Sequence, residues 1–245
     1  MNPDMKPDPY PGLAAAGDFV AALEREAARL GLDLTARPNA AAPHTSAYIP
    51  SVIAERDPLG VHIIGSESRL FRVEGGSQGI SLVSGWTSDL PDVVRAGAAW
   101  SRGASLREMR AEAPFLSYDE LAEAHECGPA AVVESQWRAM RRQAAKAPDF
   151  PEFAALVEAA HAEPRLRQLY VFSSHWTLGF SSCTGCPFRG EIAIVPPVGA
   201  LYRVRRRPMS ENLGEAATAE EAVALAVSHL RADLGPAISG TARRD

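Results

Sequence analysis

Two cysteines three positions apart, in the segment Cys183-Thr-Gly-Cys186, form the most conspicuous chemical motif of the sequence. A C-x-x-C motif is either a redox dithiol or half of a zinc site. A redox pair needs a helix N-terminus to lower the thiol pKa, whereas Pro187 and the preceding strand pattern indicate a hairpin tip. A zinc site needs two further ligands, and His125 with Cys127 is the only compact second pair. We therefore expect thiols in a turn, with no bound metal.

A serine and a histidine interrupt an otherwise apolar pair of predicted strands at residues 173–176 (SSHW). Within a strand, His175 and Trp176 would point to opposite faces, and Ser174 would share the face of Trp176. A histidine here can act as a base near neutral pH or donate to a ligand. The alternatives are a histidine bonded to a backbone carbonyl, or a bend between strands. The candidate catalytic residues are His175, Ser174 and, from the helical middle of the chain, Glu123.

An imidazole in an apolar stretch needs a hydrogen-bond partner or a role toward a ligand, because burying it without a partner is costly. We therefore expect His175 to border the main cavity. Its neighbours there would be the carboxylates of the helical region and Trp137 or Trp176. The candidate ligand-binding residues are the aromatic and basic side chains of this half of the chain, namely Trp137, Trp176, Tyr118 and Arg167. Trp137 also falls on an apolar helix stripe, which fits a place in the core equally well.

A basic cluster surrounds a predicted helix break at Pro164. His161, Arg165 and Arg167 flank this proline and offer a corner for an anion. A solvated turn is the alternative, and the sequence favours it. Glu134 and Arg138 are four residues apart on a predicted helix, a spacing typical of a surface ion pair.

Composition and missing motifs exclude several classes of function. The chain of 245 residues has a net charge of −5, so the short basic run at residues 203–207 does not predict nucleic-acid binding. No apolar run reaches the ~20 residues of a membrane span. The phosphate-binding, zincin and hydrolase signatures are missing, so we expect no cofactor. Three cysteines fit a reducing cytoplasm. The expected partner is a small-molecule or peptide intermediate, and the oligomeric state stays open.

Hydrophobic periodicity predicts an α+β fold. Residues 46–83 read as an antiparallel meander followed by a capped helix, and residues 169–204 read as a second meander followed by another. The two meander-plus-helix units form a possible pseudo-repeat around a helical insert. The predicted boundaries are a disordered tail at 1–11, a first region at 12–103, the helical insert at 104–168, a second region at 169–235 and a frayed tail at 236–245.

Four segments carry a resemblance to a known family: residues 103–109 (GASLREM), 118–126 (YDELAEAHE), 136–138 (QWR) and 164–178 (PRLRQLYVFSSHWTL). They resemble an actinobacterial family, domain of unknown function 6193, whose members are described as natural product biosynthesis proteins. The resemblance runs from about Val61 to the end and is densest between Trp100 and Phe180. It implies a cytosolic protein of secondary metabolism and carries over no catalytic residue.

Two functions remain at this point. The first is a tailoring or accessory protein of natural-product biosynthesis, acting as a cofactor-independent enzyme on a small molecule or peptide. The alternative is a non-catalytic binding protein, such as a carrier, a self-resistance protein or a protein that recognises a peptide or partner. A deep pocket containing His175 and a carboxylate would favour the enzyme. A shallow apolar groove would favour the binding protein.

Overall fold

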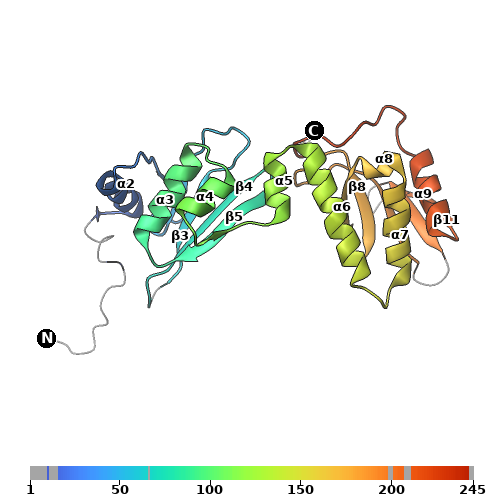
Figure 1. Ribbon diagram of the computed structural model, residues 1–245, viewed down its shortest axis with the longest axis horizontal. Coiled ribbons are helices and arrows are strands. Elements are labelled where there is room, and N and C mark those ends of the chain that lie inside the picture. Colours follow the sequence, from blue (N-terminus) through green and yellow to red (C-terminus); the bar gives the residue numbers. More distant parts are fainter. Residues whose placement is uncertain (1–9, 11–15, 66, 198–200, 207–210, 243–245) are drawn as a thin grey trace. The chain divides into compact units, whose positions relative to one another are not determined.

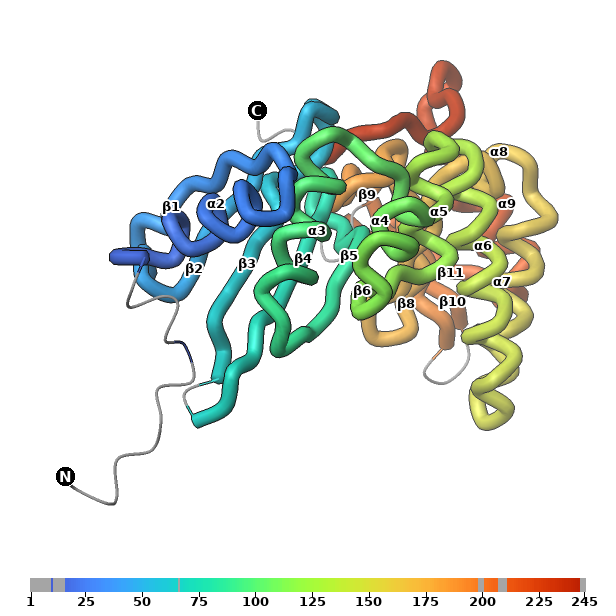
Figure 2. The backbone as a smooth tube through the Cα atoms, turned by 60° about the vertical axis from the view of Figure 1, so that its left-hand side comes forward, coloured from blue at the N-terminus to red at the C-terminus, as the bar shows by residue number. Residues whose placement is uncertain are grey.

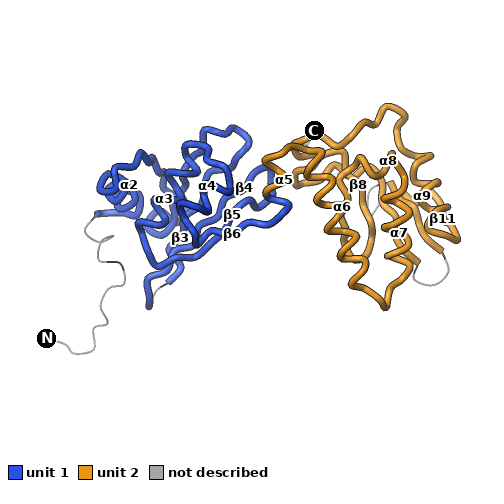
Figure 3. Tube along the Cα trace, in the orientation of Figure 1, with its two compact units in different colours: residues 1–122 blue, residues 123–245 orange. Residues whose placement is uncertain are grey.

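The polypeptide folds as two units, residues 1–122 and residues 123–245, and the boundary falls inside helix α5 (Glu120–Glu126) (Figure 3). A computed structural model describes residues 10, 16–65, 67–197, 201–206 and 211–242 (Figure 1). Each unit contains one antiparallel sheet with helices, which confirms the predicted α+β class. Among the described residues, no helix is both long and apolar enough to cross a membrane.

The first unit contains a six-stranded sheet in the order β1-β2-β3-β4-β5-β6, in which each pair of neighbours is antiparallel. Its strands are β1 (Arg37–Pro38), β2 (Ser46–Ile49), β3 (Leu59–Ile63), β4 (Phe71–Ser77), β5 (Ile80–Thr87) and β6 (Leu116–Ser117). Its helices are α2 (Phe19–Leu30), α3 (Leu90–Ser101) and α4 (Leu106–Glu112). Figure 2 shows α2 and α3 side by side over the strands.

Local sequence explains where these helices begin and end. The Asp18 carboxylate accepts a hydrogen bond from the Ala21 amide and caps α2, and Gly31 ends that helix with a φ of 68°. Ser105 and Glu108 form a capping box at the start of α4. Along the central strands, buried residues such as Phe71 and Val73 alternate with exposed or half-buried ones. This period of two turns one face of the sheet toward the helices.

The second unit contains a five-stranded antiparallel sheet in the order β11-β10-β9-β8-β7. Its strands are β7 (Tyr170–Ser174), β8 (Thr177–Ser181), β9 (Gly190–Val195), β10 (Tyr202–Arg206) and β11 (Glu211–Ala216). Its helices are α6 (Pro129–Ala145), α7 (Pro151–Ala162), α8 (Pro164–Arg167) and α9 (Ala219–Ser228). Helix α7 packs between α6 and α9, and α6 contacts β7 while α9 contacts β9, β10 and β11.

Prolines divide the helical segment of this unit. Pro129, Pro151 and Pro164 each stand in the first turn of a helix, where the missing N–H costs nothing. Gly128, with a φ of 94°, precedes α6, and the Glu163 carboxylate accepts from the Arg165 amide at the start of α8. The segment is therefore divided into three helices, of which α6 contacts strand β7 of the five-stranded sheet and α7 contacts α6 and α8.

The predicted helical insert at 104–168 is divided by the unit boundary: α4 contacts α3 and β6, whereas α6 and α7 pack in the second unit. The prediction of a frayed tail at 236–245 is wrong for residues 236–242. Ala237 donates its amide to the Gln168 carbonyl, and Ile238 donates its amide to the Ser182 carbonyl. The disordered tail predicted at 1–11 lies outside the described residues except for Tyr10, whose hydroxyl donates to the Gly65 carbonyl.

Candidate ligand-binding site

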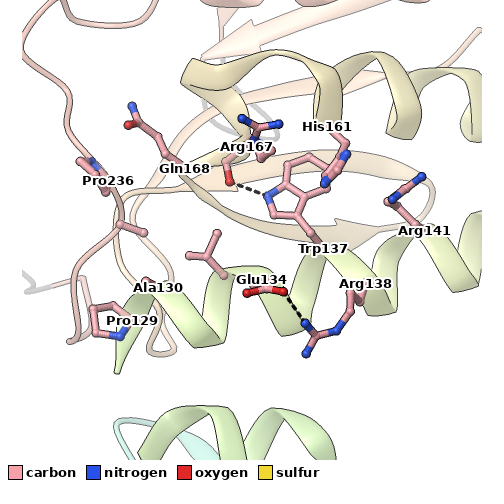
Figure 4. A pocket seen from close by; sticks show the side chains of 12 residues that line it. Pro129, Ala130, Glu134, Trp137, Arg138, Arg141, His161, Arg167, Gln168 and Pro236 are labelled. Carbon is pink, nitrogen blue, oxygen red and sulfur yellow. Dashed lines mark hydrogen bonds and ion pairs between the residues drawn. The ribbon is translucent and has the colours of Figure 1, made fainter. Parts of the chain in front are cut away.

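A cavity of about 590 Å³ opens between the helices of the second unit. Helices α6 and α7, the end of α8 and the segment that follows α9 supply its walls (Figure 4). Its lining residues are Pro129, Ala130, Val133, Glu134, Trp137, Arg138, Arg141, His161, Arg167, Gln168, Pro236 and Ala237. This volume lies within the range of small-molecule sites, roughly 300–1,000 Å³.

One face of α6 forms the floor of the cavity. Ala130, Val133, Trp137 and Arg141 follow one another at spacings of three and four residues, so they lie in a row along the helix. The row starts apolar and ends basic. The same helix therefore offers a hydrophobic surface at its beginning and a guanidinium three turns later.

Trp137 is the fixed element of this floor. It is buried, and its indole Nε1 donates to the Arg167 carbonyl at 2.9 Å and to the Leu169 carbonyl at 3.2 Å. The His161 ring meets it edge to face, with ring centroids 5.3 Å apart. Two hydrogen bonds and an aromatic contact hold the indole in one orientation, so the cavity has a preformed wall.

His161 reaches the cavity from the last turn of α7. Burial lowers the pKa of its imidazole below the ordinary value of 6.5, and the nearby guanidiniums of Arg141 and Arg167 lower it further, while the Glu158 carboxylate acts in the opposite direction. Desolvation and neighbouring positive charge both disfavour the imidazolium. His161 is therefore neutral at pH 7 and presents a nitrogen that accepts a hydrogen bond.

Three arginines line the cavity, and the partners of their guanidiniums differ. Arg138 Nη1 lies 2.7 Å from Glu134 Oε1, and Arg141 makes a two-pronged pair with Glu158 through distances of 2.7 and 2.8 Å. Within the described part of the chain, the side chain of Arg167 has no carboxylate partner. It stands exposed at the end of α8. One positive charge at the cavity is thus uncompensated.

The predicted anion corner around Pro164 forms only in part. His161 and Arg167 meet at the cavity, but Arg165 does not line it. Arg165 instead donates to the carbonyls of Val227 and Arg231 and fastens α8 to the end of α9. The sequence pattern thus identified two cavity residues and one structural residue.

The opposite wall comes from the C-terminal segment, for which no local pattern predicts a place at a cavity. Pro236 and Ala237 line the cavity. Beyond them, the chain is tied to the loop between β8 and β9 through Thr184, whose amide donates to the Ile238 carbonyl, and Gly185, whose amide donates to the Gly240 carbonyl. These backbone bonds hold the wall in position.

His175 lies elsewhere, and the expectation that it borders the cavity is wrong. Ser174 pairs with Thr177, which leaves His175 and Trp176 as a two-residue hairpin turn with φ values of 49° and 65°. Two positive φ values suit the twist of such a hairpin. The His175 side chain is exposed, and its Nδ1 lies 3.2 Å from Ser174 Oγ. The predicted alternation of His175 and Trp176 across a strand therefore fails as well.

Of the other candidate residues, Trp137 and Arg167 line the cavity and the rest do not. Trp176 is 44% exposed and packs edge to face on Phe150 and Phe153. Tyr118 belongs to the first unit, where the Arg110 guanidinium lies 5.8 Å from its ring centroid. Glu123 stands on α5. Apart from Trp137, the α6 residues that line the cavity, such as Ala130, Val133 and Arg141, were not among the candidates.

The cysteines are all free thiols. Cys183 is buried and its sulfur accepts from the Arg189 amide at 3.2 Å, whereas Cys186 and Cys127 are exposed. In the part of the chain that the structure describes, no three His, Cys, Asp or Glu side chains gather closely enough to hold a metal ion. The expectation that the protein contains no zinc stays a prediction.

Comparison with known proteins gives one match. The model of a family of unknown function, DUF6193, matches residues 131–241, which include the segments 136–138 and 164–178 that carry the resemblance. The segments 103–109 and 118–126 lie outside the matched range. No curated protein and no solved structure matched the chain.

Proposed function

Because the model of DUF6193, a family of unknown function, matches residues 131–241, we propose a function from the cavity itself. The second unit binds a small organic molecule between α6, α7 and the C-terminal segment. One observation carries the proposal: a cavity of about 590 Å³ has a mainly apolar lining and a tryptophan held by two backbone carbonyls. Apolar walls with a few fixed polar groups are typical of small-molecule sites.

Binding without turnover is the form of this function that the lining supports best. Among the described residues of the cavity wall, none is Ser, Thr, Cys or Lys, the usual nucleophiles. The Glu134 carboxylate is paired with Arg138. We therefore assign the protein to the non-catalytic class, as a carrier or recognition protein. Its proposed setting is natural-product biosynthesis in the cytoplasm, and this setting is supported by the resemblance of the sequence.

A cofactor-independent enzyme is the second candidate, and His161 favours it. A neutral imidazole beside two guanidiniums can remove a proton while the positive charges stabilise the resulting anion. His161 would then take the role that the sequence suggested for His175. A ligand that co-purifies with the protein, identified by native mass spectrometry, would be converted by the wild type and left unchanged by His161→Gln. If neither the wild type nor His161→Gln converts the ligand, the enzyme candidate fails and only the binding function remains.

The binding function is tested with a neutral fluorescent probe, N-phenyl-1-naphthylamine, whose emission rises in apolar sites. The wild type should bind it saturably at one site. Ala130→Trp should abolish binding because an indole at this lining position fills the cavity. Gln143→Trp is the matched control, since Gln143 is exposed on the same helix and does not line the cavity. Equal binding by the two variants, or none by the wild type, would contradict the proposal.

A further inference from the structure

The geometry points to the chemical class of the ligand: we propose that the cavity takes an organic monoanion with an apolar body. Its acidic head binds Arg167, and its body lies against Pro129, Ala130 and Pro236. This inference rests on the proposed binding function and adds the charge and orientation of the ligand. A carboxylate or a sulfonate head would share the required chemistry.

The first argument is that the cavity is polarised along its length. In Figure 4, Pro129, Ala130 and Pro236 gather at one end, while His161, Arg167 and Arg141 lie toward the other. No charged side chain stands among the three apolar residues in this view. A ligand that is uniformly polar would leave the apolar end unfilled, and one that is uniformly apolar would bury the guanidinium end without a partner.

The second argument is the charge at the basic end. Arg138 and Arg141 carry their own carboxylates, Glu134 and Glu158, so those two pairs are close to neutral. Arg167 adds one positive charge for which the described residues provide no carboxylate. A ligand with a single negative charge would neutralise the charge of Arg167. A cation would meet repulsion here, because no described lining residue at this end offers an unpaired carboxylate.

The third argument is the hydrogen-bonding capacity around Arg167. A guanidinium presents several N–H donors in a plane that matches the oxygens of an acidic group. The Arg167 backbone is fixed because its carbonyl accepts from Trp137 Nε1 at 2.9 Å. The head group would therefore bind the guanidinium of a residue whose backbone is held in position, beside His161.

Two probes with one skeleton test this inference. 8-Anilino-1-naphthalenesulfonate carries a sulfonate on the framework of N-phenyl-1-naphthylamine, so the pair differs in charge and in little else. The wild type should bind the sulfonate about tenfold more tightly than the neutral probe, the effect of one hydrogen bond to a charged group. Arg167→Gln should remove this advantage, so that the two probes bind this variant about equally. Arg142→Gln, which removes a charge on α6 outside the cavity lining, should retain it.

The possible failures separate the two proposals. If neither probe binds the wild type, the proposed binding function fails. If the neutral probe binds but the sulfonate gains no advantage, or if Arg167→Gln keeps that advantage, the ligand class is overturned while the binding function stands.

Discussion

Each unit of this protein buries a tryptophan beside an arginine, and the tryptophan of the second unit lines the cavity of about 590 Å³. In the first unit, Trp100 is fully buried, its Nε1 donates to the Asp57 carbonyl, and the Arg56 guanidinium lies 4.7 Å from its ring centroid. Arg56 is itself buried and donates to the Ala104 carbonyl at 2.8 Å. In the second unit, Trp137 forms part of the cavity wall.

The difference lies in what closes over each ring. The Arg56 guanidinium stacks on the Trp100 indole and donates to the Ala104 carbonyl. Both side chains therefore have their partners inside the first unit. Arg167 gives only its backbone carbonyl to Trp137, and its guanidinium stays exposed. In the first unit the arginine is therefore buried with the tryptophan, whereas in the second unit the tryptophan lines a cavity and the arginine side chain stays exposed.

The largest expected effect is on the sealed tryptophan. Trp100→Ala should lower the free energy of unfolding of the first unit by about 3–5 kcal/mol, because it removes a fully buried ring and leaves a void. Urea denaturation followed by circular dichroism measures this loss. A decrease below about 1 kcal/mol would show that Trp100 is not the centre of a closed core.

A smaller effect is expected from Trp137→Phe. An aromatic ring remains, but the carbonyls of Arg167 and Leu169 lose their shared donor. The cost should be about 1–3 kcal/mol, typical of a buried polar group left without a partner. N-Phenyl-1-naphthylamine binding should weaken in the same variant because the cavity wall is no longer fixed. Unchanged stability and unchanged binding together would mean that these hydrogen bonds do not position the indole.

The two arginines should separate stability from binding. Arg56→Met removes a buried donor to the Ala104 carbonyl and should destabilise the protein by about 1–3 kcal/mol. Arg167→Gln changes an exposed side chain and should stay within about 0.5 kcal/mol of the wild type. Thermal melts of both variants make the comparison. A strongly destabilised Arg167→Gln would assign Arg167 to the fold rather than to a ligand.

The smallest effect concerns pH. Because the pKa of His161 is lowered in the folded state, the unfolded chain takes up a proton near pH 6.5 that the folded chain resists. The contribution of this residue to stability is therefore complete above pH 6.5 and is lost as the pH falls toward the lowered pKa. Urea midpoints between pH 5 and pH 7.5 should fall less steeply for His161→Gln than for the wild type. Parallel profiles would show that His161 titrates normally.

Much of the fold was predictable because its signals are local. The helix at 219–228 follows a capping box of Thr218 and Glu221, as its sequence indicates. At α5 the cap is Asp119, whose carboxylate accepts from the Ala122 amide. Strand β11 was missed because its residues, with Asn212 and Gly214, lack an alternating apolar pattern.

The site was less predictable because its walls are distant in sequence. Trp137 and Arg167 were selected for their chemistry, but nothing local indicates that the Arg167 carbonyl meets the indole thirty residues away. Pro236 and Ala237 read as part of a frayed end, since their order depends on backbone bonds to Gln168 and to the loop after β8. The predicted strand face of His175 was wrong because the sequence does not reveal the positive φ of 49° at this residue.

The most direct test of the binding site is a crystal structure of the protein with 8-anilino-1-naphthalenesulfonate. The account predicts the naphthalene ring inside the cavity of the second unit, against Pro129 and Pro236. It places the sulfonate within hydrogen-bonding distance of the Arg167 guanidinium. A probe bound elsewhere on the protein, with the cavity beside Trp137 empty, would contradict the account.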